Sequence, residues 1–89
     1  RAMVVDKSGN LWFGGQNGLS RHDGYHTTVY KHAAADPHSL ADNRVNALHV
    51  DGQGRFWVGT ERGLCLYDPA SDRFVRHVPD AAASRAMRR

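Results

Sequence analysis

Hydrophobic and polar residues alternate in short runs along most of this chain, and glycine, aspartate and proline separate the runs. Alternation over about four to eight residues is typical of a half-buried β-strand. The glycine and proline punctuation is too dense for long helices. We predict eight short strands at Ala2–Val5, Asn10–Gly14, Leu19–His22, Thr27–His32, Val45–Val50, Arg55–Thr60, Leu64–Tyr67 and Arg73–Val78.

The second half of the chain repeats the first at an offset of 45 residues, without a gap. Residues 2–23 read AMVVDKSGNLWFGGQNGLSRHD, and residues 47–68 read ALHVDGQGRFWVGTERGLCLYD. The two segments share nine identical residues, including an aspartate, a tryptophan and three glycines at matching places. The 89 residues therefore hold about two copies of one unit.

Four short strands in a unit of about 40–50 residues are typical of a β-propeller blade. We predict an all-β fold of two four-stranded antiparallel blades, and we expect the chain to be a fragment of a larger ring. A β-sandwich is the main alternative, but it needs neither a strict repeat nor a tryptophan at the same place in each unit. The expected layout is a first blade over 1–35, an inter-blade linker over 36–44, a second blade over 45–79 and an arginine-rich, disordered tail over 80–89.

Several repeated residues have structural interpretations. The two tryptophans are expected to pack between adjacent sheets, and the aspartates are expected to hold the turns that follow them. The residues assigned to structural roles of the repeat are Asp6, Gly9, Trp12, Gly14, Gly18, Asp51, Gly54, Trp57, Gly59 and Gly63. Two isolated blades would expose apolar sheet faces, so we expect other propeller blades, in a parent chain or by self-association, to cover them.

The pattern D-x-x-G-x-(L/F)-W-x-G-(G/T)-x-x-G-L-x-x-x-D occupies residues 6–23 and again residues 51–68. It resembles the two-component regulator propeller repeat. Residues 36–45 resemble the inter-blade segment D-P-x-S-L-x-x-N-x-V of that family, and residues 67–74 resemble its Y-D-P-x-x-x-x-F ending. Gly15 departs from the family, which usually has threonine there.

The resemblance implies a biological role. Such repeats build the periplasmic ligand-sensing propellers of bacterial inner-membrane receptors, usually followed by a membrane helix and a histidine kinase. It therefore implies a fragment of a two-component sensor in signal transduction, with a glycan-derived small ligand and a membrane-anchored parent. A sensor propeller linked to a diguanylate cyclase and a purely structural propeller scaffold are the alternatives. A secreted hydrolase is disfavoured because no catalytic set is present.

Charge and cysteine content exclude some functions. The formal charge is +3, but three of the arginines lie in the last five residues, and without them nine basic residues face nine acidic ones. No basic stripe marks a nucleic-acid surface. Cys65, the only cysteine, has no partner for an intrachain disulfide and is interpreted as a packed, inert thiol.

The sequence contains no recognisable catalytic or metal-binding pattern. The six histidines are not clustered at zinc-site spacing, and the Asp6 and Asp51 turns lack the further acidic ligands of a calcium loop. Four repeated aspartates are explained by the repeat, and no facing carboxylate pair remains for hydrolysis. We therefore expect no enzymatic activity in this chain, no cofactor and no metal.

Propellers bind ligands through loops at their faces and near the central channel. The turns between the second and third strands and the end of the linker are predicted to share one face. The ligand-contact candidates are Gln16, Asn17, Asn43, Arg44, Glu61 and Arg62. Solvated loops without a ligand are the alternative interpretation of these polar residues.

Overall fold

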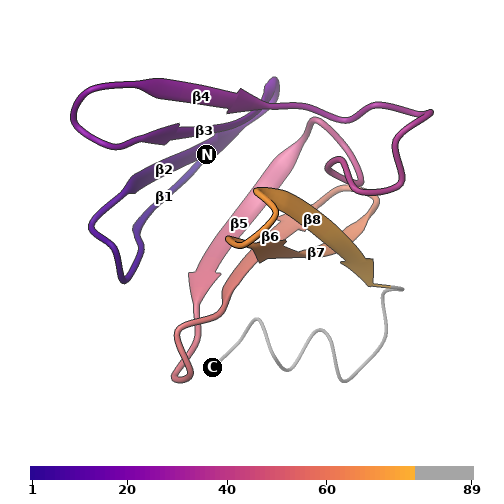
Figure 1. Cartoon of the computed structure of the whole chain (residues 1–89). Helices are drawn as coiled ribbons and strands as arrows, with labels where there is room; N and C mark the ends of the chain where they lie inside the picture. The colour runs from indigo at the N-terminus through magenta and orange to yellow at the C-terminus, as the bar shows by residue number, and fades with distance from the viewer. Residues whose placement is uncertain (78–89) are drawn as a thin grey trace.

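The computed structural model describes residues 1–77 and consists of two antiparallel sheets of four strands each (Figure 1). The first sheet contains β1 (Ala2–Val5), β2 (Leu11–Gly15), β3 (Gly18–His22) and β4 (Thr27–Tyr30). The second contains β5 (Val45–Val50), β6 (Phe56–Thr60), β7 (Gly63–Asp68) and β8 (Arg73–His77). Each sheet is a meander in chain order, so the predicted pair of four-stranded antiparallel sheets is confirmed.

The predicted strand bounds differ from the structure by one or two residues at several ends. The largest difference is in β4, which ends at Tyr30 rather than His32. The backbone N–H of His32 donates to Oδ1 of Asn43 at 2.7 Å, so this residue bonds the linker instead of extending the ladder. Val78 and the predicted tail over 80–89 lie outside the described residues.

The first turn of each repeat is built around one aspartate. Oδ1 of Asp6 accepts hydrogen bonds from the backbone N–H groups of Ser8 and Asn10, both at 2.9 Å. The turn closes at Gly9, whose backbone has φ +85°, a left-handed conformation that glycine adopts without strain. Asp51 and Gly54 repeat this arrangement, with φ +81° at the glycine. The repeat motif therefore specifies one turn twice.

The core lies between the two sheets. Trp12 of β2 is fully buried and contacts rings from the second sheet, with centroid distances of 4.6 Å to Phe56 and 4.9 Å to Tyr67. Tyr30 stacks on the same indole at 5.6 Å. Buried aromatic side chains contribute a large share of the packing energy of a protein core. Trp12 therefore links the two sheets.

The two tryptophans do not occupy the same position relative to the two sheets. In β6, Phe56 and Val58 face the first sheet, and Trp57 between them points to the opposite face. Its ring lies 5.3 Å from the ring of His77. The expectation that the tryptophans pack between adjacent sheets is confirmed for Trp12. For Trp57 it stays a prediction, because residues 1–77 form no sheet beyond the second.

The linker closes the outer edge of the second sheet. Leu40 and Ala41 are buried in the core, and Phe74 of β8 donates its backbone N–H to the carbonyl oxygen of His38 at 3.0 Å. The Arg76 guanidinium donates to the backbone oxygen of Leu40 at 3.1 Å and to two other residues of the linker. A sheet edge covered in this way offers fewer free backbone groups to another strand.

Candidate functional site

A polar hollow of about 480 Å³ lies where the first sheet, the linker and the second sheet meet. Its lining residues come from four places in the chain: the residue before β1, the end of β2 with the turn that follows it, the end of the linker with the start of β5, and the turn between β6 and β7. The lining residues are Arg1, Gly15, Gln16, Asn17, Arg44, Val45, Asn46 and Glu61. Within residues 1–77, the Gln16, Asn17, Arg44 and Glu61 side chains form no hydrogen bond or ion pair with protein.

Two backbone hydrogen bonds hold these segments together. The N–H of Gly18 donates to the carbonyl oxygen of Asn43 at 2.7 Å, and the N–H of Glu61 donates to the carbonyl oxygen of Arg44 at 3.0 Å. Gly18 has φ +105°, which side-chain-bearing residues rarely adopt, and an added Cβ would lie close to the carbonyl oxygen of Tyr30. The glycine therefore lets β3 begin close to the backbone at the end of β4.

The structure brings together four of the six candidate residues named from the sequence. Gln16, Asn17, Arg44 and Glu61 line the hollow. Asn43 does not, because its side-chain oxygen accepts the backbone N–H of His32 and so helps to fix the linker. Arg62 follows Glu61 but does not line the hollow. Its backbone N–H donates to Oγ1 of Thr60 at 3.2 Å.

Sequence reasoning missed Asn46, which lies within a strand. Val45 pairs with Thr60 and Ala47 pairs with Gly59, so Asn46 is an extra residue opposite two consecutive partners. This irregularity is a β-bulge, and bulges often redirect a side chain at the edge of a site. The sequence does show a polar residue, Asn46, directly after the buried Val45. Hydrophobic and polar alternation alone, however, predicts that such a residue simply faces solvent.

The hollow combines donors and acceptors. Arg44 supplies a guanidinium, Glu61 a carboxylate, and Gln16, Asn17 and Asn46 supply amides that both donate and accept. All five residues are exposed, so their side chains keep their own hydration. Such a set is suited to hydrogen-bond a ligand rich in hydroxyl groups, and it contains no nucleophile paired with a base.

The groups with the most displaced pKa values lie elsewhere and have structural partners. The hydrogen bond from Trp57, outweighing desolvation, holds the pKa of Asp51 far below its usual value. Burial, with hydrogen bonding to Asp72, raises the pKa of Tyr67 to about 12 and that of Tyr30 further still. Ion-pair and hydrogen-bond networks that stabilise folds displace pKa values as active sites do. These groups therefore do not indicate catalysis.

The histidines and the cysteine have structural surroundings. His22 bonds the hydroxyls of Ser20 and Thr27, each at 3.1 Å, and Nδ1 of His32 lies 2.7 Å from the carbonyl oxygen of Leu40. Cys65 is fully buried, and burial raises the pKa of its thiol. Among residues 1–77, no three His, Cys, Asp or Glu side chains gather as a metal site would require. In the same part of the chain, no helix is long and apolar enough to cross a bilayer.

Comparison with known protein families finds a match within the repeated region. Residues 39–62, which cover the end of the linker, β5 and β6, match the family model described as "Two component regulator propeller". No curated protein matches the sequence.

Solved structures extend the likeness to most of the chain. The extracellular domain of the hybrid two component system BT4673 from B. thetaiotaomicron is 26% identical, with a TM-score of 0.73 over 85% of this chain and 11% of that one. The extracellular domain of the hybrid two component system BT3049 from the same organism has the same identity and TM-score, over 91% of this chain and 12% of that one. This chain thus spans only a small part of the length of these relatives. In its duplicated motif, its matched repeat and its two-blade fold, the chain is similar to the two component regulator propeller family.

Proposed function

We propose that this chain forms two blades of the ligand-sensing propeller of a bacterial sensor that signals through a histidine kinase. The likeness to extracellular domains of two component systems supports this role and a periplasmic location in a membrane-anchored receptor. The same blades could precede a diguanylate cyclase, since the described residues carry no output domain of either kind. Catalysis, in this proposal, belongs to the output domain and not to the blades.

The single observation that carries the sensing role is the polar hollow between the blades. Its side chains come from both repeats, although the two repeats differ there: Gln16 and Asn17 in the first correspond to Glu61 and Arg62 in the second. Positions that serve the fold alone, such as the aspartate of each first turn and the tryptophan of the strand that follows it, are identical in the two copies. Side chains that vary between copies and form no bonds within the described residues are free to be used for recognition.

The proposed ligand is a small glycan-derived molecule. Amides, a guanidinium and a carboxylate pair well with the vicinal hydroxyl groups of a sugar, because each hydroxyl both donates and accepts. A hollow of about 480 Å³ is of the size of ordinary small-molecule sites. Arg44 additionally suits a sugar that carries a carboxylate.

Titration of the isotope-labelled chain with neutral and uronic-acid-containing oligosaccharides, followed by NMR, tests the proposal. We expect backbone amide shifts that saturate at Gln16, Asn17 and Asn46. Arg44→Ala should weaken the binding at least about tenfold, which corresponds to about 1.4 kcal/mol. Arg62→Ala is the matched control, because it removes the same charge from a neighbouring position outside the hollow.

The outcomes separate the alternatives. If no oligosaccharide shifts these amides, the ligand-sensing role of these two blades is wrong and the scaffold alternative is favoured. If Arg62→Ala weakens binding and Arg44→Ala does not, the site lies on the outer side of the β6–β7 turn and the hollow is not the site.

A further inference from the structure

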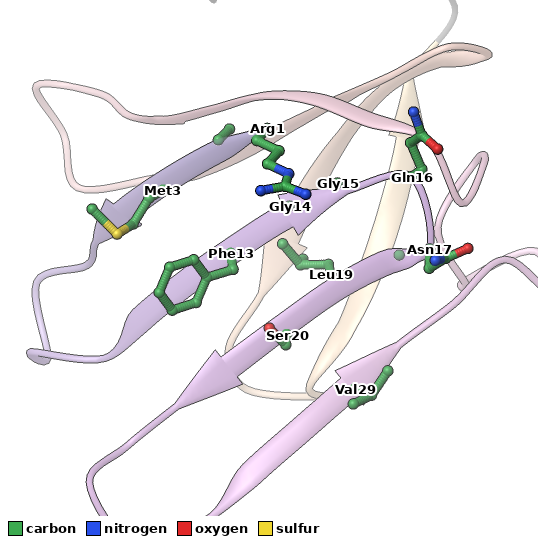
Figure 2. Close-up of a pocket in the computed structure, with 12 residues that line it drawn as sticks. Arg1, Met3, Phe13, Gly14, Gly15, Gln16, Asn17, Leu19, Ser20 and Val29 are labelled. Atoms are coloured by element: carbon green, nitrogen blue, oxygen red, sulfur yellow. The ribbon is translucent and has the colours of Figure 1, made fainter.

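The turn between β2 and β3 contains the only Asn-Gly pair of the chain, Asn17 and Gly18. The backbone nitrogen that follows an asparagine can attack the side-chain amide, and a glycine nitrogen does so most readily because glycine has no Cβ to hinder it. The Asn17 side chain is exposed, and within residues 1–77 it forms no hydrogen bond with protein. Figure 2 shows it at the turn, beyond the ends of both strands. Its amide is therefore free to react.

The carboxylates that precede a glycine are held in place. Asp51 precedes Gly52, but its carboxylate accepts four hydrogen bonds. Asp23 precedes Gly24, and its Oδ1 accepts two backbone N–H groups. A side chain held in this way does not turn easily toward the next backbone nitrogen, and an ionised carboxylate is a poor electrophile. Asn17 is under neither restraint.

The fold requires the glycine of this pair but not the asparagine. Gly18 has φ +105° and its repeat counterpart Gly63 has φ +140°, a region that favours glycine. The residue before the glycine is Asn17 in the first repeat and Arg62 in the second. Position 17 therefore accepts different side chains, and the reactive pair is confined to the first repeat.

One hydrogen bond restrains the attacking nitrogen. The N–H of Gly18 donates to the carbonyl oxygen of Asn43 at 2.7 Å, and the backbone rotation at Asn17 that brings this nitrogen to Cγ would break that bond. The side chain of Asn43 accepts the N–H of His32, also at 2.7 Å, and so fixes the linker that carries the carbonyl. The reaction therefore needs a local opening in which the turn leaves the linker.

We propose that Asn17 and Gly18 form a self-modification site, where local opening of the β2–β3 turn converts Asn17 into aspartate or isoaspartate. The nitrogen of Gly18 forms a bond to Cγ of Asn17 while the Cγ–Nδ2 bond breaks. The N–H proton passes through a solvent base to the leaving nitrogen, which departs as ammonia. Water then opens the cyclic imide, at Cγ to give aspartate or at the backbone carbonyl to give isoaspartate. This inference does not depend on the proposed sensing role.

The products change the hollow in two ways. A carboxylate at position 17 joins that of Glu61 among the lining residues and leaves Arg44 facing two negative charges. Isoaspartate also adds a carbon to the main chain before Gly18, which displaces the N–H that bonds the linker. In the proposed sensor, an anionic sugar should bind the modified chain more weakly than a neutral one, because like charges repel. That last consequence alone rests on the proposed function.

Peptide mapping of the full 89-residue chain after storage at mildly alkaline pH tests the proposal, with tandem mass spectrometry to locate the modified residue. Asn10, Asn43 and Asn46 are internal controls, because leucine, arginine and alanine follow them. Asn17 should react at least about tenfold faster than any of the three. Its rate should rise with pH, since the attacking nitrogen must lose its proton. Equal rates at all the asparagines, or a rate at Asn17 that does not rise with pH, overturn the proposal.

Two variants test the opening step. Asn43→Ala removes the acceptor of the His32 N–H and so loosens the linker. It should raise the rate at Asn17 about fivefold, as expected when one hydrogen bond that opposes opening is lost. Asn46→Ala is the matched control, because it makes the same substitution at a residue that lines the hollow and does not brace the linker. It should leave the rate unchanged, and circular dichroism checks that both variants fold.

Unfolding the chain gives a second measurement of the same step. In urea the original chain and both variants should react at one common rate, faster than that of the folded chain, because no closed turn then restrains Gly18. A folded chain that reacts as fast as the unfolded one shows that the bond to Asn43 does not restrain the reaction, and the opening step is then wrong. A folded Asn43→Ala chain that reacts no faster than Asn46→Ala leads to the same conclusion.

Discussion

Nε1 of Trp12 donates a hydrogen bond to Oδ2 of Asp6 at 2.8 Å, and this bond joins the centre of the core to the first turn of the repeat. The other carboxylate oxygen of Asp6 accepts two backbone N–H groups of that turn. One side chain therefore fixes both the turn and the orientation of the indole that packs between the sheets. The second copy repeats the arrangement with Asp51 and Trp57.

Replacing Asp6 with alanine should destabilise the chain by about 1–3 kcal/mol, because the buried indole N–H and the turn both lose an ionised acceptor. Chemical denaturation followed by tryptophan fluorescence measures the loss. Asp23→Ala is the control. Asp23 lies in an exposed turn and also accepts two backbone N–H groups, but it forms no hydrogen bond with a tryptophan. Equal losses in the two variants would show that the bond to the indole adds nothing.

Acid should destabilise the fold through the same carboxylates. The hydrogen bond from Trp57 holds the pKa of Asp51 far below the usual 3.8, and the bonds from Trp12 and the turn lower the pKa of Asp6 despite its burial. A carboxylate with a lowered folded-state pKa stabilises the fold above its unfolded value, and this contribution is lost as the pH falls through the folded value. We therefore expect the denaturation midpoint to drop steadily below about pH 4.

Asp51→Asn isolates the part of that dependence due to Asp51. The amide cannot ionise, so the variant should be less stable than the original chain at neutral pH and should lose less stability on acidification. Parallel denaturation curves at several acidic pH values give the comparison. An unchanged slope against pH in Asp51→Asn would mean that other groups account for the acid sensitivity.

The fold could be predicted from the sequence because the residues that the turn and the core require occur in both repeats. The aspartate and the glycine of the turn and the tryptophan of the following strand recur at one offset, and each has the same hydrogen bonds or backbone conformation in both copies. The repeat does not predict which face of each sheet packs against another sheet. Trp12 and Trp57 occupy equivalent strand positions, yet within residues 1–77 only Trp12 packs on another sheet, because that depends on the neighbouring sheets and not on the local pattern.

The candidate site was predictable only in part, for a similar reason. Turn residues such as Gln16 and Glu61 are conspicuous because they are polar and differ between the repeats. Asn43 looks alike in sequence, but its side chain is used by the backbone of His32, which only the fold reveals. Asn46 reaches the hollow through a bulge, and periodicity predicts regular strands without bulges.

The neighbouring glycines of β2 should respond differently to substitution. A Cβ on Gly14 would clash with Cγ1 of Val45 and lie 3.0 Å from its Cβ, whereas a Cβ on Gly15 would meet nothing within 4 Å. Gly14→Ala should therefore push β5 away from β2 and cost about 1–3 kcal/mol. Gly15→Ala should leave stability almost unchanged. Thermal unfolding of both variants checks this, and similar midpoints would contradict the close approach of the two sheets at Gly14.

Alkali should destabilise the contact between the sheets through Tyr30 and Tyr67. Both hydroxyls donate to Oδ1 of Asp72 at 2.6 Å, and a phenolate there would face a carboxylate. Burial, followed by this hydrogen bond, raises the pKa of Tyr67 from 10.0 to about 12. A tyrosine with a raised folded-state pKa stabilises the fold below pH 10, and that contribution is lost as the pH rises through the folded value. The midpoint of unfolding should therefore fall above about pH 10.

Asp72→Asn in a Tyr25→Phe background tests the cause, because Tyr30 and Tyr67 are then the only tyrosines that contribute to the phenolate absorbance. Asparagine tolerates the left-handed backbone at position 72, where φ is +58°, so the turn is kept while the charge is removed. Without the carboxylate the phenolates are no longer opposed by a negative charge, and their titration should move to lower pH. If the midpoint of the phenolate titration is the same as in the Tyr25→Phe chain, burial alone raises the pKa of these hydroxyls. Asp72 is then not the cause of the alkaline destabilisation.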